Sequence, residues 1–239
     1  MANSYFQFKK FTIYHDLCAM KVGTDGVLLG AWAAVTDAQK ILDIGTGTGL
    51  IALMLAQRKH DASIHAIDID AGAAQQAVVN VQASPYASQI EVKHMPLDKY
   101  AETCSYHYDL IVSNPPYFEQ SLKCPNGQRS LARHTDSLSL DDLLTAATKL
   151  LTPTGHIALV LPADQIKQVE TVAARSNLFV SKCNWIHPTP TSLPKRILIE
   201  LSQAADAKER IEEHLVIELA RHKYTPEYIA LTKNFYFKM

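Results

Sequence analysis

The sequence lacks the cysteine and histidine patterns that mark disulfide-bonded and metal-binding proteins. Its four cysteines are Cys18, Cys104, Cys124 and Cys183, which lie far apart and form no Cys-x-x-Cys pair. The ten histidines show no metal-ligand spacing either. We therefore expect a reduced, cytoplasmic protein that binds no metal.

Long apolar runs and an excess of positive charge are also missing. No apolar run approaches the roughly 20 residues of a membrane span, and the first residues lack the apolar core of a signal peptide. We expect no membrane partner. The formal net charge is -1, so no overall basic field indicates a nucleic-acid partner, and any such surface must be local.

The 239 residues, 47% of them apolar, are enough for one large α/β domain with a full core. Apolar segments of strand length alternate with segments of helix length, which predicts a doubly wound sheet. Only residues 186–195 separate the last two expected strands, too few for a parallel crossover, so this end of the sheet is expected to be antiparallel. The expected strands are 41–44, 63–68, 90–95, 109–113, 156–161, 179–185 and 196–201, and the main helices are 27–32, 50–56, 71–81, 140–151 and 163–176.

The two ends of the chain are expected to join the same domain. Residues 5–22 alternate in a way typical of a hairpin or paired strands. Residues 206–213 form a charged run expected to be a helix or a linker. The tail is apolar enough to pack back on the core. We predict a single domain over 1–239, with an N-terminal extension (1–40), a catalytic core (41–202) and a C-terminal appendage (203–239).

One expected strand ends abruptly in the tetrad Asn114-Pro115-Pro116-Tyr117. The prolines force a stiff turn at the carboxyl end of the strand, which is the edge where open α/β sheets bind ligands. The Asn114 amide and a proline carbonyl offer two acceptors, and Tyr117 offers a flat stacking surface, a set that fits a planar amino group. The alternative is a turn that merely stops the strand, with Asn114 as a cap and Tyr117 packed on the surface.

A glycine-rich turn follows the strand that contains Asp43. The run Gly45-Thr46-Gly47-Thr48-Gly49 leads into an apolar helix, so a ligand can approach bare backbone at a helix N-terminus. A dinucleotide fingerprint would need glycine at position 50, where Leu50 stands, which disfavours nicotinamide and flavin cofactors. Asp68 ends the next strand about 20 residues beyond the glycines, where a carboxylate can hold both hydroxyls of a ribose. Asp70 is better placed to cap the following helix, so Asp68 indicates an adenosine moiety.

Two further loops offer cofactor contacts and leave alternatives open. Thr24 or Asp25 could cap the helix that follows, or could meet the charged amino-acid end of a cofactor together with Lys21. The loop Met95-Pro96-Leu97-Asp98 could sandwich an adenine ring, with Asp98 accepting from its amino group, or Asp98 could start the next helix.

A long polar segment, 118–135, leaves directly from the tetrad. It carries four basic residues: Lys123, Arg129, Arg133 and His134. Loops of this length in compact domains are often functional. The segment could guide a large anionic substrate to the site, or it could be a solvated surface.

Together these motifs resemble class I S-adenosylmethionine-dependent methyltransferases, which implies a seven-stranded sheet with the last strand reversed. The tetrad is similar to the signature of amino-group methyltransferases that act on adenine N6, cytosine N4 or a glutamine amide. Residues 15–32, 128–133 and 228–236 are similar to the bacterial tRNA1(Val) (adenine-37-N6)-methyltransferases, which modify the adenosine 3′ of the anticodon. The resemblance implies that S-adenosylmethionine is held by Asp43, Gly45, Gly47 and Asp68, and that adenine is held by Asn114, Pro115 and Tyr117. It also implies that tRNA is the partner. We expect the protein to be monomeric.

Other functions fit the sequence less well. Protein-glutamine methyltransferases share the tetrad, but the forty residues before Asp43 leave no room for the helical N-terminal domain they need. A non-catalytic RNA-binding relic of the fold should carry a damaged glycine turn or tetrad, and both are complete. Leu50 disfavours a nicotinamide oxidoreductase. Another adenine, in ribosomal RNA or DNA, remains an alternative substrate.

Overall fold

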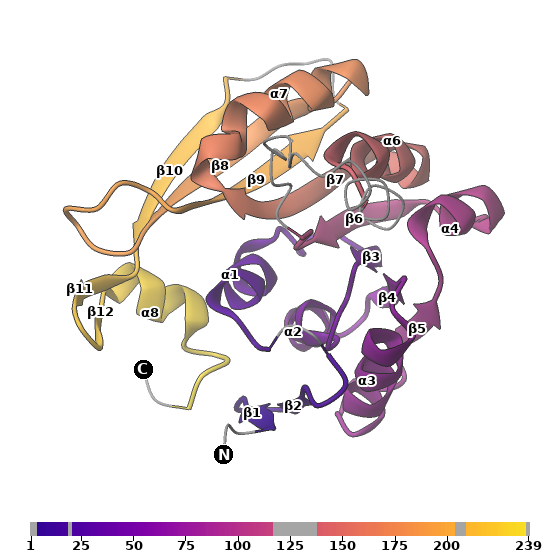
Figure 1. Cartoon of the computed structure of the whole chain (residues 1–239), viewed down its shortest axis with the longest axis horizontal. Helices are drawn as coiled ribbons and strands as arrows, with labels where there is room; N and C mark the ends of the chain where they lie inside the picture. Colours follow the sequence, from indigo (N-terminus) through magenta and orange to yellow (C-terminus); the bar gives the residue numbers. More distant parts are fainter. Residues whose placement is uncertain (1–3, 19–20, 117–137, 204–208, 238–239) are drawn as a thin grey trace, which may run out of the picture.

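The computed structural model describes residues 4–18, 21–116, 138–203 and 209–237. Its centre is an eight-stranded sheet in the order β10-β8-β9-β7-β6-β3-β4-β5, with helices on both faces (Figure 1). The strands are β3 (Lys40–Ile44), β4 (Ser63–Asp68), β5 (Ile90–His94), β6 (Tyr108–Ser113), β7 (Leu151–Pro162), β8 (Phe179–His187), β9 (Arg196–Ser202) and β10 (Ile211–Val216).

The sheet confirms the predicted class. All neighbouring strands are parallel except that β9 runs antiparallel to both β7 and β8. The apolar strands are buried on both faces, as a sheet covered by helices on each side requires. Among the described helices, none has the length and apolar character needed to cross a membrane.

The edge strand β10 was not predicted. A helix or a linker was expected over 206–213, but residues from Ile211 onward pair in parallel with β8, so for 211–213 that prediction was wrong. The acidic side chains there are compatible with a strand because each has a partner: Glu213 lies 2.9 Å from the Lys182 ammonium, and Glu212 contacts Arg210. Charged residues are common on edge strands, where they oppose further pairing.

Helices pack on the sheet in two groups that form two apolar clusters. One face is covered by α1 (Thr24–Trp32), α2 (Leu50–Arg58), α3 (Ala71–Gln82) and α8 (Pro226–Thr232), and the other by α4 (Leu97–Thr103), α6 (Leu140–Leu150) and α7 (Ile166–Arg175), which follows a 3-10 turn at Ala163–Gln165 (Figure 1). Close approach of α1 and α2 depends on Gly30, because a Cβ there would lie 2.8 Å from the Met54 sulfur. Gly26 likewise faces Leu50, so the two helices run side by side from the same edge of the sheet.

The two ends of the chain lie together against this first face. A hairpin or paired strands were expected over 5–22, and among the described residues this pairing is limited to β1 (Tyr5–Gln7) and β2 (Thr12–Tyr14). The Lys9 amide donates to the Phe235 carbonyl at 2.8 Å, and the Phe8 and Tyr236 rings stack 5.7 Å apart. A second short hairpin, β11 (Glu218–Ala220) and β12 (Lys223–Tyr224), precedes α8.

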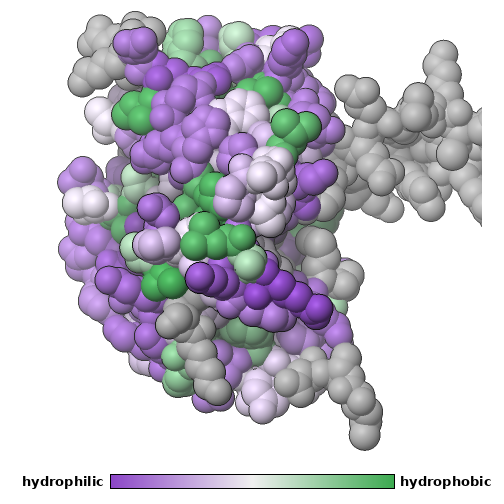
Figure 2. Space-filling view, turned by 90° about the vertical axis from the view of Figure 1, so that its left-hand side faces the viewer, coloured by the Kyte–Doolittle hydropathy of each residue, from purple (hydrophilic) through white to green (hydrophobic). Residues whose placement is uncertain are grey.

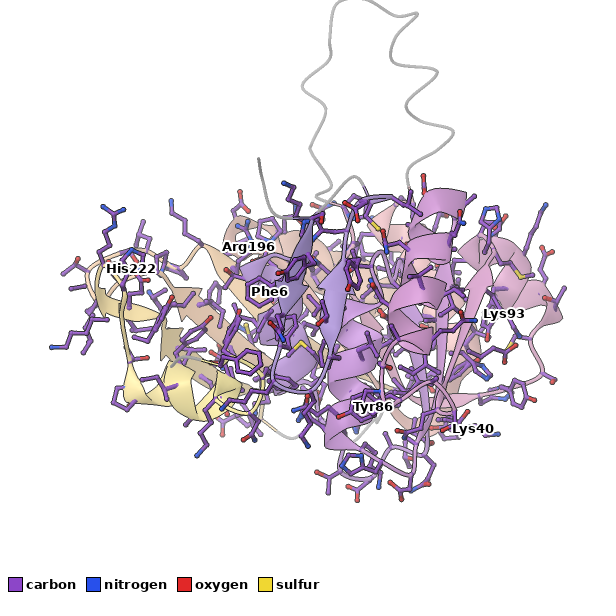
Figure 3. The ribbon with its side chains drawn as sticks, turned by 90° about the horizontal axis from the view of Figure 1, so that it is seen from below. Phe6, Lys40, Tyr86, Lys93, Arg196 and His222 are labelled. Atoms are coloured by element: carbon purple, nitrogen blue, oxygen red, sulfur yellow. The ribbon has the colours of Figure 1, made fainter. Side chains whose placement is uncertain are left out.

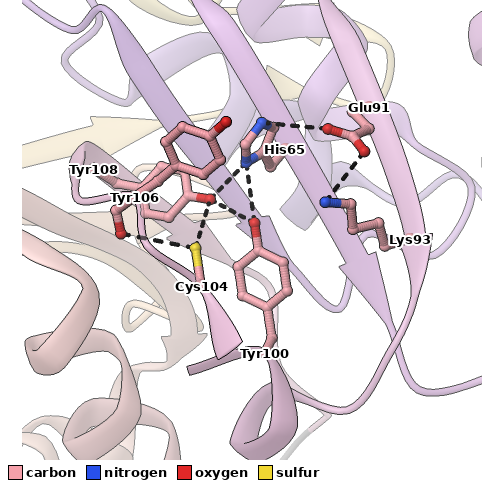
Figure 4. Close-up of polar contacts among 7 residues, drawn as sticks. All are labelled: His65, Glu91, Lys93, Tyr100, Cys104, Tyr106 and Tyr108. Atoms are coloured by element: carbon pink, nitrogen blue, oxygen red, sulfur yellow. Dashed lines mark hydrogen bonds and ion pairs between the residues drawn. The ribbon is translucent and has the colours of Figure 1, made fainter. Parts of the chain in front are cut away.

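A buried polar cluster fastens α4 to the sheet (Figure 4). His65 Nδ1 of β4 lies 2.6 Å from the Tyr108 hydroxyl of β6 and 3.0 Å from the Tyr100 hydroxyl of α4. Burial lowers the pKa of His65, so the neutral ring is favoured in this contact. By fixing α4, the cluster also fixes the 95–98 loop at the carboxyl end of β5.

Candidate active site

Site residues predicted from the sequence lie at the carboxyl ends of three adjacent strands, on one edge of the sheet. Ile44 pairs with Ser113 of β6 on one side and with Ile67 of β4 on the other. Gly45, Asp68 and Asn114 therefore begin their loops side by side, because the carboxyl ends of parallel strands meet at the same edge.

The glycine turn between β3 and α2 exposes backbone to open space. Gly45, Gly47 and Gly49 have φ of 69°, 57° and 80°, a left-handed conformation that strongly favours glycine. A Cβ at Gly45 or Gly47 would meet no atom of the described chain within 4 Å, whereas one at Gly49 would lie 3.4 Å from the Ala77 Cβ. The first two glycines therefore border room for a ligand, and the third allows close packing on α3.

Asp43 lies beneath this turn, and only one of its two carboxylate oxygens accepts hydrogen bonds from the described part of the chain. Its Oδ2 accepts hydrogen bonds from Thr46 Oγ1 at 2.6 Å and from the Ala52 amide at 3.2 Å. Its Oδ1 is buried and has no hydrogen-bond partner within the described part of the chain. Burial raises the pKa of Asp43 to about 7. A buried acceptor without a partner is costly, and a donor group of a ligand would satisfy it.

The raised pKa of Asp43 predicts an unusual dependence of stability on pH. Because the native state holds this proton more tightly than the unfolded state, the contribution of Asp43 to stability is complete below pH 3.8 and is lost as the pH rises to about 7. As the pH rises over this range, the free energy of unfolding of the ligand-free protein is expected to fall more than that of the Asp43→Asn variant. The difference between the two decreases is on the order of 4 kcal/mol at most. Urea unfolding of both proteins at several pH values measures this; parallel curves would contradict it.

Asp68 holds the glycine turn and keeps room for a ligand. Its Oδ2 accepts from the Gly47 amide at 2.8 Å and its Oδ1 from the Asp70 amide at 2.9 Å. An ionised carboxylate has about four acceptor sites, so each oxygen can still accept from a hydroxyl. The capping role belongs to Asp70, which accepts from the Ala73 amide at 2.7 Å. The preference for Asp70 as the helix cap is thus confirmed, and Asp68 remains available for the proposed ribose contact.

The capping interpretation of Thr24 and Asp25 was wrong. α1 begins at Thr24, with Gly23 as N-cap and no side-chain cap bond. Both residues lie inside the first turn of the helix, and the Asp25 carboxylate instead accepts from Arg196 Nε of β9 at 2.8 Å. Lys21 and Thr24 are exposed. A Cβ at Gly26 would lie 3.1 Å from Leu50 Cδ2, which brings the start of α1 beside the end of the glycine turn.

The 95–98 loop adjoins Asp68 through the β4–β5 pairing. The Met95 amide donates to the Asp68 carbonyl at 2.9 Å. Leu97 is buried at the start of α4, for which Pro96 is the N-cap, and Asp98 is exposed in the first turn. Its carboxylate is therefore accessible, although the residue also belongs to the helix, as the alternative interpretation expected.

Sequence reasoning missed one neighbour of this site, because it assigned the segment to a hairpin. Leu17 donates its amide to Gln76 Oε1 at 3.1 Å, which holds the chain along α3. The next residue, Cys18, has a pKa raised to about 11 by burial and by the charges of Asp68 and Asp70. This part of the N-terminal extension therefore borders the carboxylates at the end of β4.

The tetrad begins directly beside the glycine turn. Ser113 Oγ donates to the Ile44 carbonyl at 2.8 Å and fastens the end of β6 to β3. Asn114 is half-buried, Pro115 is buried and Pro116 is exposed. Tyr117 of the tetrad lies outside the described residues, as do the four predicted contacts of the segment that follows: Lys123, Arg129, Arg133 and His134.

Comparisons with known proteins show which proteins this chain is similar to. The family model for the methyltransferase small domain matches residues 23–175. The chain is 56% identical over 239 residues, the full length of both chains, to the tRNA1(Val) (adenine(37)-N6)-methyltransferase of Parabacteroides distasonis. It is 48% identical over 240 residues, again the full length of both, to the enzyme of that name from Trichodesmium erythraeum.

Solved structures share the fold at low sequence identity. A predicted O-methyltransferase from Agrobacterium tumefaciens matches with a TM-score of 0.68 and 18% identity, covering 88% of this chain and 96% of the other. A ribosomal protein L11 methylase from Lactobacillus delbrueckii matches with a TM-score of 0.51 and 19% identity, covering 74% and 76%.

Proposed function

Because this chain belongs to the tRNA1(Val) (adenine(37)-N6)-methyltransferase family, we propose that it methylates N6 of adenine 37 in tRNA1(Val). S-adenosylmethionine is the methyl donor. The observation that carries the proposal is the placement of Asn114 and Pro115 at the end of β6, beside the glycine turn at the end of β3. This pairing supports a site in which the proposed amine acceptors and the proposed cofactor cradle are neighbours.

The residues at this edge fit the cofactor. The unpaired Asp43 Oδ1 and the open space beside Gly45 and Gly47 are features a bound ligand would satisfy and fill. Asp68 would hold the ribose hydroxyls, and the exposed Lys21 and Thr24 would meet the amino-acid end. Leu97 and Asp98 would border the adenine of the cofactor. When bound, S-adenosylmethionine supplies an electrophilic methyl group on a sulfonium.

The tetrad would orient the amine of the target adenine. This amine is a weak nucleophile because its lone pair is delocalised into the ring. The Asn114 side-chain oxygen and the Pro115 carbonyl accept its two hydrogens, which draws the lone pair towards attack. Pro116 keeps the turn stiff, and Tyr117 stacks on a base turned out of the anticodon loop. Positioning carries most of the rate, and the proton leaves to water after transfer.

The segment after Tyr117 is proposed to contact tRNA through Lys123, Arg129, Arg133 and His134. We expect Arg129→Glu with Arg133→Glu to weaken tRNA binding and to flatten its salt dependence, because fewer phosphate contacts release fewer counterions. Filter binding at several salt concentrations measures both quantities. Unchanged affinity and slope would mean that this segment does not bind tRNA.

The test of the proposed function is methyl transfer to bacterial tRNA that lacks the modification, followed by mass analysis of nucleosides. N6-methyladenosine in a valine tRNA is the expected product. Binding of S-adenosylmethionine without transfer to tRNA would redirect the search to DNA, ribosomal RNA or protein glutamines. Binding without transfer to any of these would indicate a non-catalytic module.

We also propose that residues 1–239 act as one domain, because the N-terminal hairpin contacts α3 and the C-terminal segment contacts α1 and α2. Gln57 Nε2 of α2 donates to the Asn234 carbonyl at 2.9 Å, and α1 packs against α8. A monomeric state and a cytoplasmic location stay predictions.

A further inference from the structure

The sheet divides into two halves with different loops at the active-site edge. The glycine turn, Asp68 and the 95–98 loop all follow strands of the β3-β4-β5 half. On the other half, β9 runs antiparallel and Arg196 pairs with Pro162 at the end of β7, so the β8–β9 loop lies at this same edge. β10 is parallel to β8, so the β11–β12 hairpin that follows it also begins there.

A compact basic tip projects from this second half. Ala220 pairs with Lys223, which leaves Arg221 and His222 as the two residues of the turn. All of Arg221, His222 and Lys223 are exposed, and His222 adopts a left-handed φ of 61°. Within the described part of the chain, no ion pair involves Arg221 or Lys223.

The acidic side chains of β10 do not neutralise this tip. Glu213 is engaged with Lys182 at 2.9 Å, and Glu212 is engaged with Arg210 and with the Trp185 indole, which donates at 2.6 Å. Glu218 of β11 forms no ion pair with the turn either, so among the described residues the cations of the turn have no carboxylate partner and are available to an external anion. The net charge of -1 shows only that the chain as a whole is neutral, and a local surface such as this one can still bind a polyanion.

The hairpin is held in place by backbone bonds to the rest of the edge. The Glu218 amide donates to the Pro188 carbonyl of the β8–β9 loop at 3.0 Å, and the Ile217 amide donates to the His187 carbonyl at 2.9 Å. Thr225, the N-cap of α8, donates its amide to the Ile217 carbonyl at 3.0 Å. The β8–β9 loop carries a further exposed cation, Lys195. These bonds pre-organise the hairpin and the loop as one surface.

This surface and the proposed adenine pocket lie on the same edge of the sheet but on different strands. Four strand spacings separate β6 from β10, which corresponds to about 19 Å along the sheet. Figure 3 shows Arg196 and His222 on the side of the molecule away from Lys40, which begins β3. Figure 2, which faces the β10 edge, shows mostly hydrophilic side chains with smaller hydrophobic patches between them. A nucleic acid with one base at Asn114 would have to extend about 19 Å along the sheet to reach the β10 edge, from which the tip projects.

We propose that Arg221 and Lys223, together with Lys195, bind the phosphate backbone of the stem below the anticodon loop whose adenine enters the Asn114 pocket. This inference rests on the proposed function. Two separated contacts, the pocket and the tip, fix the direction of the stem, because phosphate contacts set register and orientation without reading sequence.

The test uses two double variants. The tip variant carries Arg221→Ala and Lys223→Ala, and the control variant carries Lys149→Ala and Arg175→Ala. The control removes two exposed cations from the last turns of α6 and α7, and Arg175→Ala also removes an ion pair of 3.6 Å with Asp141. We expect the tip variant to bind unmodified tRNA1(Val) about 10- to 30-fold more weakly at physiological salt, and the slope of log K against log salt to fall by about 1.5. The control variant should bind as the parent protein does.

Two further measurements separate the possible failures. Calorimetric binding of S-adenosylmethionine should be unchanged in the tip variant, which shows that the fold is intact. Arg221→Lys keeps the charge and should retain affinity and salt slope. If the parent protein methylates tRNA but the tip variant keeps its affinity and slope, the inference is overturned and the proposed function stands. If the parent protein neither binds nor methylates tRNA, the proposed function itself fails.

Discussion

Asn114→Ala is expected to lower kcat for tRNA about 100- to 1000-fold while cofactor affinity stays nearly normal. This is the range seen when one hydrogen-bonding group that stabilises a transition state is removed. Asn114 is half-buried at the end of β6, and no cofactor contact is assigned to it. Single-turnover methylation and calorimetric binding of S-adenosylmethionine measure the two effects separately.

A conservative replacement sharpens this prediction. Asn114→Asp keeps an acceptor oxygen at the same position, so it should retain more turnover than Asn114→Ala. Near-normal turnover of the alanine variant would remove Asn114 from the mechanism. Loss of cofactor binding in the alanine variant would instead mean that Asn114 shapes the site, with no specific part in orienting the amine.

Gly47→Val is expected to weaken binding of S-adenosylmethionine about 100-fold. The φ of 57° makes any side chain costly here by about 1–2 kcal/mol, which lowers stability but leaves the fold intact. The larger effect is steric, because the new side chain would occupy the open space beside the turn where the ligand meets backbone. Isothermal calorimetry gives the affinity, and thermal unfolding gives the stability.

Gly49→Ala is the matched control for the strain. Its φ of 80° imposes a similar backbone cost, but its Cβ would point at Ala77 of α3 at 3.4 Å, away from the open space. We expect this variant to lose stability and to keep most of its cofactor affinity. Equal losses of affinity in both variants would mean that backbone strain, and not occupied space, explains the effect at Gly47.

The strand ends were the most predictable part of the site. Gly45, Asp68 and Asn114 each stand at or just after the end of an apolar strand, and parallel strands bring such ends to one edge whatever else the chain does. The sequence could not reveal that Asp43 Oδ1 lacks a partner or that Asp68 holds the Gly47 amide, because these depend on how loops 21 residues apart meet.

Two errors came from local reasoning about charged and polar residues. Thr24 and Asp25 are good caps in isolation, but α1 begins at Thr24 with Gly23 as its N-cap, and Asp25 pairs with Arg196, which lies 171 residues away. The charges of 211–213 suggested a helix or a linker, whereas these residues lie on an edge strand where Lys182 and Arg210 pair with Glu213 and Glu212. The His65, Tyr100 and Tyr108 cluster has no local signal at all, because its members come from three separate elements.

The central claim is that this site methylates the exocyclic amine of adenine 37 in tRNA1(Val). The most direct test compares two transcripts of that tRNA, one with adenine and one with guanine at position 37, under single-turnover conditions with labelled S-adenosylmethionine. Labelled N6-methyladenosine at position 37 of the first transcript, and no label in the second, is the predicted result. Equal labelling of both transcripts, or methyl transfer at another position, would contradict it.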